Sequence, residues 1–293
     1  MSGPVCGPVI AVHGGAGGLG EELQSRAAEY RAALTNALMS GAAALRAGGG
    51  ALDAVRVAVM TMEDFPLMNA GHGAALCQDG SVELSASAMR GSDRAAGAVA
   101  LIRRTRNPVA AAAALIEEPE VLLAGERADA FAAAYGLEQR DPSEFVTERQ
   151  RARLAGRSSG DGGTVGAVCL DGDGVLAAAT STGGLQGQRP GRVGDSPLIG
   201  AGTWADRHVA VSCTGKGEAF VRAGAARLLG ALVAGGVALQ DAARAVLDAV
   251  AECDGDGGLI AVDARGQVVL PFSAGAMPRG VWRGGEDIVV EVP

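Results

Sequence analysis

The chain has 293 residues, 48% of them hydrophobic and 20% charged, a balance typical of a globular protein with a sizeable core. Its net charge of −8 argues against a nucleic-acid partner, because proteins that bind phosphate backbones normally carry a basic field or stripe. Aromatic residues make up only 3% and glycine reaches 46 residues, so we expect a core of closely packed Ala, Val and Leu side chains.

The first half of the chain is predicted to contain a buried strand at residues 8–13, helices at 21–47 and 51–65, and a hairpin of strands 73–77 and 81–86. A strand at 96–102 and helices at 107–118, 126–135 and 143–154 follow, and small, polar residues then predict a flexible linker at about 155–163.

The second half is predicted to begin with a hairpin of strands 165–170 and 175–180. A strand at 209–213, helices at 218–233 and 239–253, and strands at 259–262, 267–271 and 288–292 complete it. Because hairpins outnumber β-α-β units, the pattern favours an α+β fold of antiparallel sheets covered by helices.

The cysteines are odd in number, widely scattered and without a CxxC pair, so they predict neither a disulfide framework nor a zinc site; they are Cys6, Cys77, Cys169, Cys213 and Cys253. The amino-terminal residues lack a basic segment followed by a long apolar one, and no run of about 18 apolar residues occurs. These features predict a cytoplasmic protein with no membrane segment.

Two short motifs suggest chemistries that their contexts disfavour. Residues 15–20 match GxGxxG, but a helix, not a second strand, is expected after the helix that follows, so a dinucleotide site is disfavoured. Residues 156–160 match GxSxG, and Ser158 is followed by Asp195 and His208 in the order of a hydrolase triad. A nucleophile elbow requires a strand before the serine, whereas a helix precedes this one, so a linker is the better interpretation.

The stretch GDGGTVGAVCLD (160–171) runs from glycines directly into a strand whose first residue is Thr164. If Thr164 attacks the carbonyl of Gly163, the peptide rearranges to an ester, and hydrolysis frees the threonine α-amine. An α-amine has an unperturbed pKa of about 7.7–8.0, so it can act as the base for its own hydroxyl without a histidine.

A turn centred between residues 172 and 173 pairs position 164 with 181, next to Thr182, whose hydroxyl is then predicted to support the nucleophile. On spacing alone, a Thr164 that merely caps a strand edge is the competing interpretation.

Seven blocks occur in a fixed order along the chain: VHGGAGG (12–18), NAGHGAAL (69–76), GGTVGAVCLD (162–171), TSTGG (180–184), PGRVGDSPLIGAGTWAD (190–206), SCTGKGE (212–218) and GGLIAVD (257–263). In these blocks the sequence resembles the plant-type asparaginases and isoaspartyl peptidases, which are N-terminal nucleophile hydrolases.

The resemblance implies a single domain, a four-layer αββα sandwich, cleavage between Gly163 and Thr164 into segments 1–163 and 164–293, and an (αβ)2 assembly of two processed protomers. Carried over by motif, Thr164 is nucleophile and base, Thr182 its supporting hydroxyl, and Thr214 with the Gly215 amide the oxyanion hole. Arg192 is expected to bind the substrate α-carboxylate and Asp195 its α-ammonium, aided by the backbone near Gly217. A local surface ion pair is the competing interpretation for Arg192 and Asp195.

No cofactor is expected for catalysis. Residues 62–71 resemble the family's sodium-binding loop, which predicts a structural Na⁺ held mainly by backbone carbonyls near Glu63, Phe65 and Asn69.

Three departures bear on the substrate. An ELDA block is replaced by Glu83-Leu84-Ser85-Ala86, and an FNTxGMYRG block by residues 272–280, with Ser273 and Ala274. The chain's only lysine, Lys216, lies at a predicted helix amino terminus, where the dipole disfavours a cation. We expect Lys216 to attract the carboxylate of a β-aspartyl dipeptide's leaving group; an indifferent exposed side chain is the alternative.

The predicted reaction is hydrolysis of L-asparagine and of β-aspartyl dipeptides through an aspartyl ester on Thr164. Two alternatives stay open: the same fold with another acyl donor, such as glycosylasparagine or a specialised metabolite amide, and an unprocessed, non-catalytic homologue.

Overall fold

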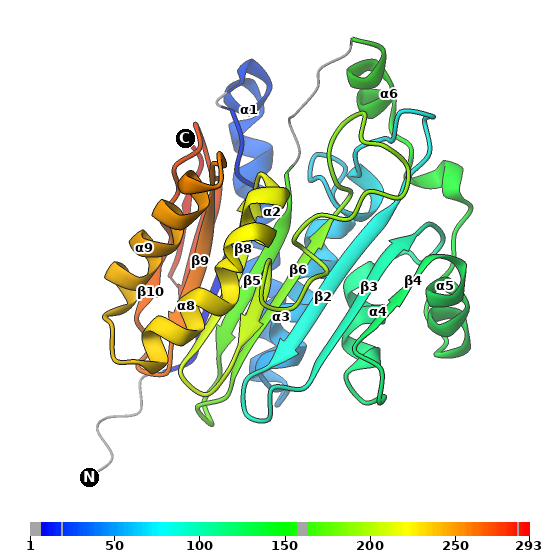
Figure 1. The fold of residues 1–293 in the computed structure, drawn as a ribbon. Helices are drawn as coiled ribbons and strands as arrows, with labels where there is room; N and C mark the ends of the chain where they lie inside the picture. Colours follow the sequence, from blue (N-terminus) through cyan, green and yellow to red (C-terminus); the bar gives the residue numbers. More distant parts are fainter. Residues whose placement is uncertain (1–6, 19, 157–162, 286) are drawn as a thin grey trace.

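The computed structural model describes residues 7–18, 20–156, 163–285 and 287–293, and two stacked β-sheets lie at its centre with helices on both outer faces (Figure 1). This arrangement is the α+β sandwich that the hairpin-rich sequence predicts. Part of the predicted linker, residues 157–162, lies outside the described residues, as does Cys6.

The larger sheet contains the strand that begins after Thr164. Its strands lie in the order β12 (Ile288–Glu291), β11 (Arg279–Arg283), β1 (Val9–His13), β5 (Val165–Leu170), β6 (Leu176–Thr182), β2 (Leu84–Arg90), β3 (Ala96–Ile102) and β4 (Leu122–Ala124). All neighbours are antiparallel except β3 and β4. The smaller sheet is antiparallel, in the order β10 (Val268–Val269), β9 (Gly257–Asp263), β8 (Val209–Gly215) and β7 (Thr203–Ala205).

The longer helices α2 (Ala27–Arg46), α3 (Ala51–Glu63) and α9 (Leu239–Glu252) bury regularly spaced apolar faces. The first group is α1 (Glu21–Ser25), α2, α3, α4 (Pro108–Leu115), α5 (Gly125–Ala134) and α6 (Glu148–Ala155), with the 3₁₀ turns η1 (Gly71–Gly73) and η2 (Pro142–Phe145). Helices α7 (Gly217–Ala223), α8 (Ala225–Ala234) and α9 belong to the smaller sheet. In α2 the buried residues Tyr30, Leu34, Ala37 and Leu38 recur at three- and four-residue spacing, which keeps them on one helix face.

Small residues allow the two sheets to lie close together. A Cβ atom at Gly166 in β5 would lie only 2.0 Å from the hydroxyl oxygen of Ser212 in β8. The apolar layer between the sheets is likewise rich in short side chains such as Ala11, Ala178 and Ala210. The high glycine and alanine content therefore brings β5 and β8, which carry predicted catalytic residues at their ends, into close contact.

Several predicted elements differ from the structure. The predicted hairpin of strands 73–77 and 81–86 is wrong: Cys77 accepts from Gly80 and donates to Ser81 through the backbone in a tight turn, and β2 begins only at Leu84. The predicted helix 21–47 breaks at Arg26, and the predicted helix 218–233 breaks at Gly224, which adopts φ +57°. The short strands β4, β7 and β11 were not predicted.

Among the described residues, no helix is both long and apolar enough to cross a membrane. The described cysteines, Cys77, Cys169, Cys213 and Cys253, are free thiols.

Candidate active site

The hairpin of β5 and β6 brings Thr164 beside Thr182. Thr164 is buried, and its hydroxyl donates to Thr182 Oγ1 at 3.2 Å. The ladder pairs Val165 with Ser181, so its continuation sets position 164 opposite 182. The predicted pairing of 164 with 181 is therefore wrong by one residue, although the predicted contact between the two threonines is present.

The turn between the strands explains this difference in register. Asp171 Oδ1 accepts hydrogen bonds from the backbone amides of Asp173 and Val175, at 3.0 and 2.8 Å. The backbone amide of Asp171 also donates to the carbonyl of Val175. These bonds centre the turn on residue 173, half a residue beyond the centre inferred from the sequence.

The carbonyl oxygen of Gly163, the residue before the candidate nucleophile, accepts two side-chain hydrogen bonds. Asn69 Nδ2 donates to it at 2.7 Å and Thr182 Oγ1 at 3.2 Å. The backbone amide of Gly184 donates to Thr182 Oγ1 at 3.0 Å. One directed chain thus runs from the Thr164 hydroxyl through the Thr182 hydroxyl to the oxygen on which charge develops when Thr164 attacks.

A glycine at position 15 allows the loop after β1 to pass close to the Gly163–Thr164 peptide. Gly15 adopts φ +105°, and a Cβ there would lie 2.8 Å from Gly163 Cα and 3.0 Å from the Thr164 nitrogen. The next amide, that of Ala16, donates to Thr214 Oγ1 at 3.0 Å. This loop therefore contacts both Thr164 and Thr214. Gly215, the last residue of β8, directly follows Thr214 in the chain.

Arg192 is held by an acidic side chain on its Nε side. Its Nε and Nη2 donate to the two carboxylate oxygens of Glu218 at 2.9 and 3.0 Å, and its Nη1 donates to Gln188 at 3.3 Å. Since a guanidinium has five N–H donors, its Nη1–Nη2 edge retains donors for a substrate carboxylate. Arg192 is thus fixed in orientation by Glu218, a partner that the sequence did not indicate.

Asp195 lies beside Arg192 and Gly217. A Cβ at Gly217 would lie 2.8 Å from Asp195 Oδ1 and 3.0 Å from Arg192 Nη2, so a glycine is needed at this position. Asp195 Oδ2 is buried and has no hydrogen-bond partner among the described residues. Burial raises the pKa of Asp195 to about 7, outweighing the opposing effects of its own backbone amide and of Arg192. The structure thus brings Arg192, Asp195 and Gly217 together, as the motif predicts.

Ser196 connects this group to the nucleophile, since its hydroxyl oxygen lies 3.5 Å from Thr164 Oγ1. A series of buried hydroxyls runs from the carbonyl of Ser196 between the sheets to His13, with Ser87, Thr203, Thr180 and Ser212 in contact in turn. Burial lowers the pKa of His13 to about 3, so its imidazole is neutral. Neither Ser196 nor His13 was predicted as a site residue; the adjacent Asp195 was the only signal for Ser196.

The side chain of Lys216 is bonded to Asp254, which lies outside the group formed by Arg192, Asp195 and Gly217. It is exposed, and its ammonium donates to the carbonyl oxygen of Asp254 at 2.6 Å. Its backbone precedes α7, as the sequence predicts.

Residues 62–71 run from the last residues of α3 to the first residue of η1. The Asn69 side chain is fully used, since it donates to Gly163 and Gly184 and accepts from the amide of Ala75. Glu63 Oε1 accepts from Ser181 at 2.6 Å and from the Val109 amide at 3.0 Å. The side chain of Asn69 thus donates a hydrogen bond to the Gly163–Thr164 peptide, a contact that the sequence did not reveal.

The backbone carbonyl oxygens of Pro66 and Met68, in the same loop, both lie close to Gly73. A Cβ at Gly73 would lie 2.1 Å from the carbonyl oxygen of Met68 and 2.7 Å from that of Pro66. The Phe65 carbonyl accepts from the Met68 amide. No group of three or more His, Cys, Asp or Glu side chains among the described residues is arranged to hold a metal ion.

Residues of the two altered family blocks, the unchanged Glu83 among them, make contacts next to the site or within the sheets. Glu83 accepts from the amide of Gly191, next to Arg192, at 2.8 Å. Ser85 accepts from the Leu101 amide at 3.3 Å, within the sheet. Ser273 donates through its backbone to the carbonyl of Gly257 at 2.7 Å.

The GxGxxG match lacks the second strand that a dinucleotide site requires. The glycines of the GxGxxG match line a pocket beside Gly163, and α2 follows α1 with no strand between them. Ser158 lies outside the described residues, and His208 contacts Arg207.

Known proteins resemble this chain over most of its length. A model of the asparaginase family matches residues 6–291. The isoaspartyl peptidase of Escherichia coli K12 is 46% identical, covering 92% of this chain and 91% of its own length. Proteins named isoaspartyl peptidase/L-asparaginase from Bos taurus and Xenopus laevis are 39% and 40% identical, covering 96% and 92% of this chain and 94% and 90% of their own lengths. The chain therefore belongs to the asparaginase family of N-terminal nucleophile hydrolases.

Proposed function

We propose that the chain cleaves itself between Gly163 and Thr164, and that the freed Thr164 hydrolyses L-asparagine and β-aspartyl dipeptides. The observation that carries this proposal is the hydrogen-bonded chain from the Thr164 hydroxyl through Thr182 to the Gly163 carbonyl. The names of the relatives, which include both isoaspartyl peptidase and L-asparaginase, support the same substrates.

Self-cleavage begins when Thr164 Oγ1 attacks the Gly163 carbonyl carbon. The developing oxyanion is stabilised by Asn69 Nδ2 and the Thr182 hydroxyl. The C–N bond then breaks, the Thr164 nitrogen takes the proton that the Thr164 hydroxyl gives up, and Gly163 is left as an ester on Thr164 Oγ1. Water hydrolyses this ester, which yields the segments 1–163 and 164–293.

In turnover, the free α-amine of Thr164 takes the proton from its own hydroxyl. Arg192 binds the substrate α-carboxylate through its Nη1–Nη2 edge and Asp195 binds the α-ammonium. Thr214 and the Gly215 amide stabilise the oxyanion, and the amine leaving group takes the proton from the Thr164 ammonium. Water then releases L-aspartate from the aspartyl ester.

We also propose a structural Na⁺ in residues 62–71, held by backbone carbonyls and supplying no step of the reaction. The convergence of the Pro66 and Met68 carbonyls near Gly73 supports oxygen ligation. An (αβ)2 assembly and a cytoplasmic location remain proposals as well; the free thiols agree with a reducing compartment.

The experiment that tests the proposed function is turnover of L-asparagine, β-Asp-Leu and glycosylasparagine by the purified protein, with Thr164→Ala as the control. We expect release of aspartate from the first two substrates and none from the control. Faster turnover of glycosylasparagine would favour an altered acyl donor, and no turnover of any substrate would favour a non-catalytic homologue.

A further inference from the structure

A second pocket, with a volume of about 630 Å³, lies at the end of the sandwich away from Thr164, and we call it the remote pocket. It is formed by the turn between β2 and β3, the turn between β7 and β8, and the carboxyl end of α8. Strand β8 begins directly after His208, which lines the remote pocket, and ends at Gly215 in the proposed oxyanion hole. At about 3.3 Å per residue, this strand separates the two sites by about 20 Å. The proposed reaction therefore does not use the remote pocket.

Three arginines line the remote pocket, and none of them forms an ion pair within the described residues; they are Arg94, Arg207 and Arg227. All three are exposed. Arg207 Nε donates to the His208 imidazole at 3.1 Å, which leaves the Nη N–H groups of Arg207 for a ligand. The Arg227 guanidinium lies over the Trp204 ring, 4.8 Å from its centroid, so the N–H groups at its edge stay available. The remote pocket thus offers free cationic donors.

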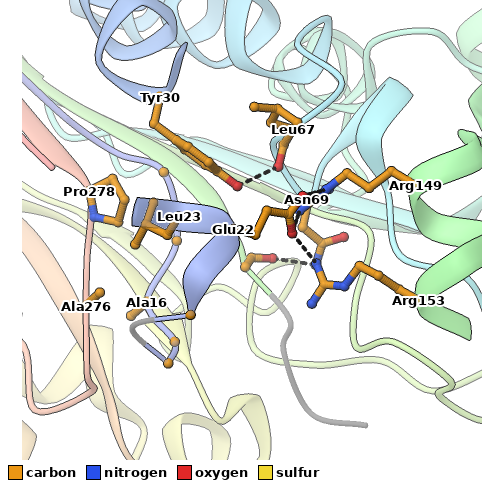
Figure 2. Close-up of a pocket in the computed structure, with 16 residues that line it drawn as sticks. Ala16, Glu22, Leu23, Tyr30, Leu67, Asn69, Arg149, Arg153, Ala276 and Pro278 are labelled. Atoms are coloured by element: carbon orange, nitrogen blue, oxygen red, sulfur yellow. Dashed lines mark hydrogen bonds and ion pairs between the residues drawn. The ribbon is translucent and has the colours of Figure 1, made fainter. Parts of the chain in front are cut away.

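The arginines of the pocket beside Gly163 are bound within the protein instead (Figure 2). Arg149 donates to the Glu22 carboxylate through Nε and Nη2, and Arg153 Nη1 lies 4.0 Å from the same carboxylate. The remote pocket is therefore the better candidate for binding an anion.

Two carboxylates also line the remote pocket, and both have partners other than the three arginines. Asp93 is paired with Arg90 at 2.9 Å. Asp206 is buried and accepts from Trp204 Nε1 at 3.0 Å and from two backbone amides. The guanidiniums that line the pocket thus outnumber its carboxylates, in a protein whose net charge is −8. This local excess of positive charge favours an anionic ligand.

The backbone around the remote pocket is closely packed. A Cβ at Gly91 would lie 2.4 Å from the carbonyl oxygen of Asp206, so the two turns that form the pocket are in contact. A Cβ at Gly230 would lie 2.5 Å from Trp204 Nε1, so the indole packs directly on α8, where it also orients Arg227. A site held in this way has less to order when a ligand binds.

We propose that the remote pocket binds a small polyanion, a metabolite that carries two or more carboxylate or phosphate groups. Guanidiniums recognise both groups through paired N–H donors. The pocket volume lies within the range of about 300–1,000 Å³ that is typical of small-molecule sites, so the ligand is large enough to reach more than one arginine. Because the pocket is remote from Thr164, its ligand and the substrate can be bound at the same time.

The test is isothermal titration calorimetry of the purified protein with citrate and with pyrophosphate, at constant ionic strength. We expect one site per chain; tighter binding of citrate indicates a polycarboxylate ligand, and tighter binding of pyrophosphate a phosphorylated one. Arg207→Gln and Arg227→Gln are each expected to weaken binding about tenfold, as for loss of a charge-assisted hydrogen bond. Arg244→Gln is the matched control, because Arg244 is an exposed arginine of α9 outside the pocket lining.

The melting temperature of each variant is measured, so that misfolding is recognised. Saturating L-aspartate, which is expected to occupy the catalytic site, should leave the affinity for both probes unchanged. Absence of binding of either probe to the wild-type protein, equal weakening by Arg207→Gln and Arg244→Gln, or competition with L-aspartate would each overturn the inference. None of these results depends on self-cleavage or turnover, so the proposed function is tested separately.

Discussion

The side-chain amide of Asn69 donates to the carbonyl oxygen of Gly163 at 2.7 Å, and this carbonyl is the one that Thr164 attacks in the proposed self-cleavage. The same side chain is fixed by the amide of Ala75, which donates to Asn69 Oδ1 at 2.6 Å. Asn69 is therefore a preorganised donor, which stabilises an oxyanion without reorganising during the reaction.

Replacing Asn69 by Asp is expected to slow self-cleavage by about 10²-fold, because removal of one oxyanion donor typically costs about that factor. The aspartate keeps the acceptor for Ala75 but lacks the amide donor. The time course of fragment formation measures the effect, and the melting temperature shows whether the precursor is folded. Wild-type cleavage rates in a folded Asn69→Asp chain would argue against this function of Asn69.

Thr182 is expected to act through its hydroxyl and not through its shape. Thr182→Val removes the contacts to Thr164 and Gly163 at nearly constant volume, and should lower both self-cleavage and turnover by about 10²-fold or more. Thr182→Ser keeps the hydroxyl and is expected to retain most of the activity. Equal rates for the valine and serine variants would contradict this account.

Gly15 is expected to tolerate no side chain. In Gly15→Ala the new Cβ would meet Gly163 Cα at 2.8 Å in a backbone conformation with φ +105°, so the scissile peptide is displaced and self-cleavage is largely lost. Gly17→Ala in the same loop is the control, since nothing lies within 4 Å of its Cβ position. Fragment yield after equal incubation distinguishes the two, and similar yields would refute the close approach.

The sequence predicts the longer helices and strands of the fold better than the turns and the short strands. The helices α2, α3 and α9 and the strands β1, β3 and β5 follow from regular apolar spacing. The turn register was missed by one residue, because it is set by the Asp171 side chain. The strands β4 and β7 have only three residues each, too few for a periodic signal.

Site residues within one motif were predictable, whereas contacts between distant segments were not. Arg192 and Asp195 lie three residues apart in a single block, and the structure keeps them together. Asn69 is separated from its partner Gly163 by 94 positions, and Glu22 from its partner Arg149 by 127. Neither pair has a local sequence signal, because each depends on how the helices pack around the larger sheet.

The raised pKa of Asp195 predicts that recognition of the substrate ammonium depends on pH. Its carboxyl has a pKa of about 7, raised by burial, so it is mostly protonated below that pH and ionised above it. Competitive inhibition by L-aspartate, relative to succinate, which lacks the ammonium, should strengthen roughly tenfold between pH 6 and pH 8. Asp195→Asn should abolish this change. A ratio of inhibition constants that stays constant with pH in the wild-type enzyme would be inconsistent with Asp195 binding the ammonium.

The most direct measurement is the intact mass of the purified protein after incubation at neutral pH, beside a Thr164→Ala control. The account predicts that the 29.1 kDa chain is replaced by two fragments, one ending at Gly163 and one beginning at Thr164, in the wild-type sample only. A 29.1 kDa chain that persists in both samples would contradict it, because Thr164 would then never gain the free amine that the reaction requires.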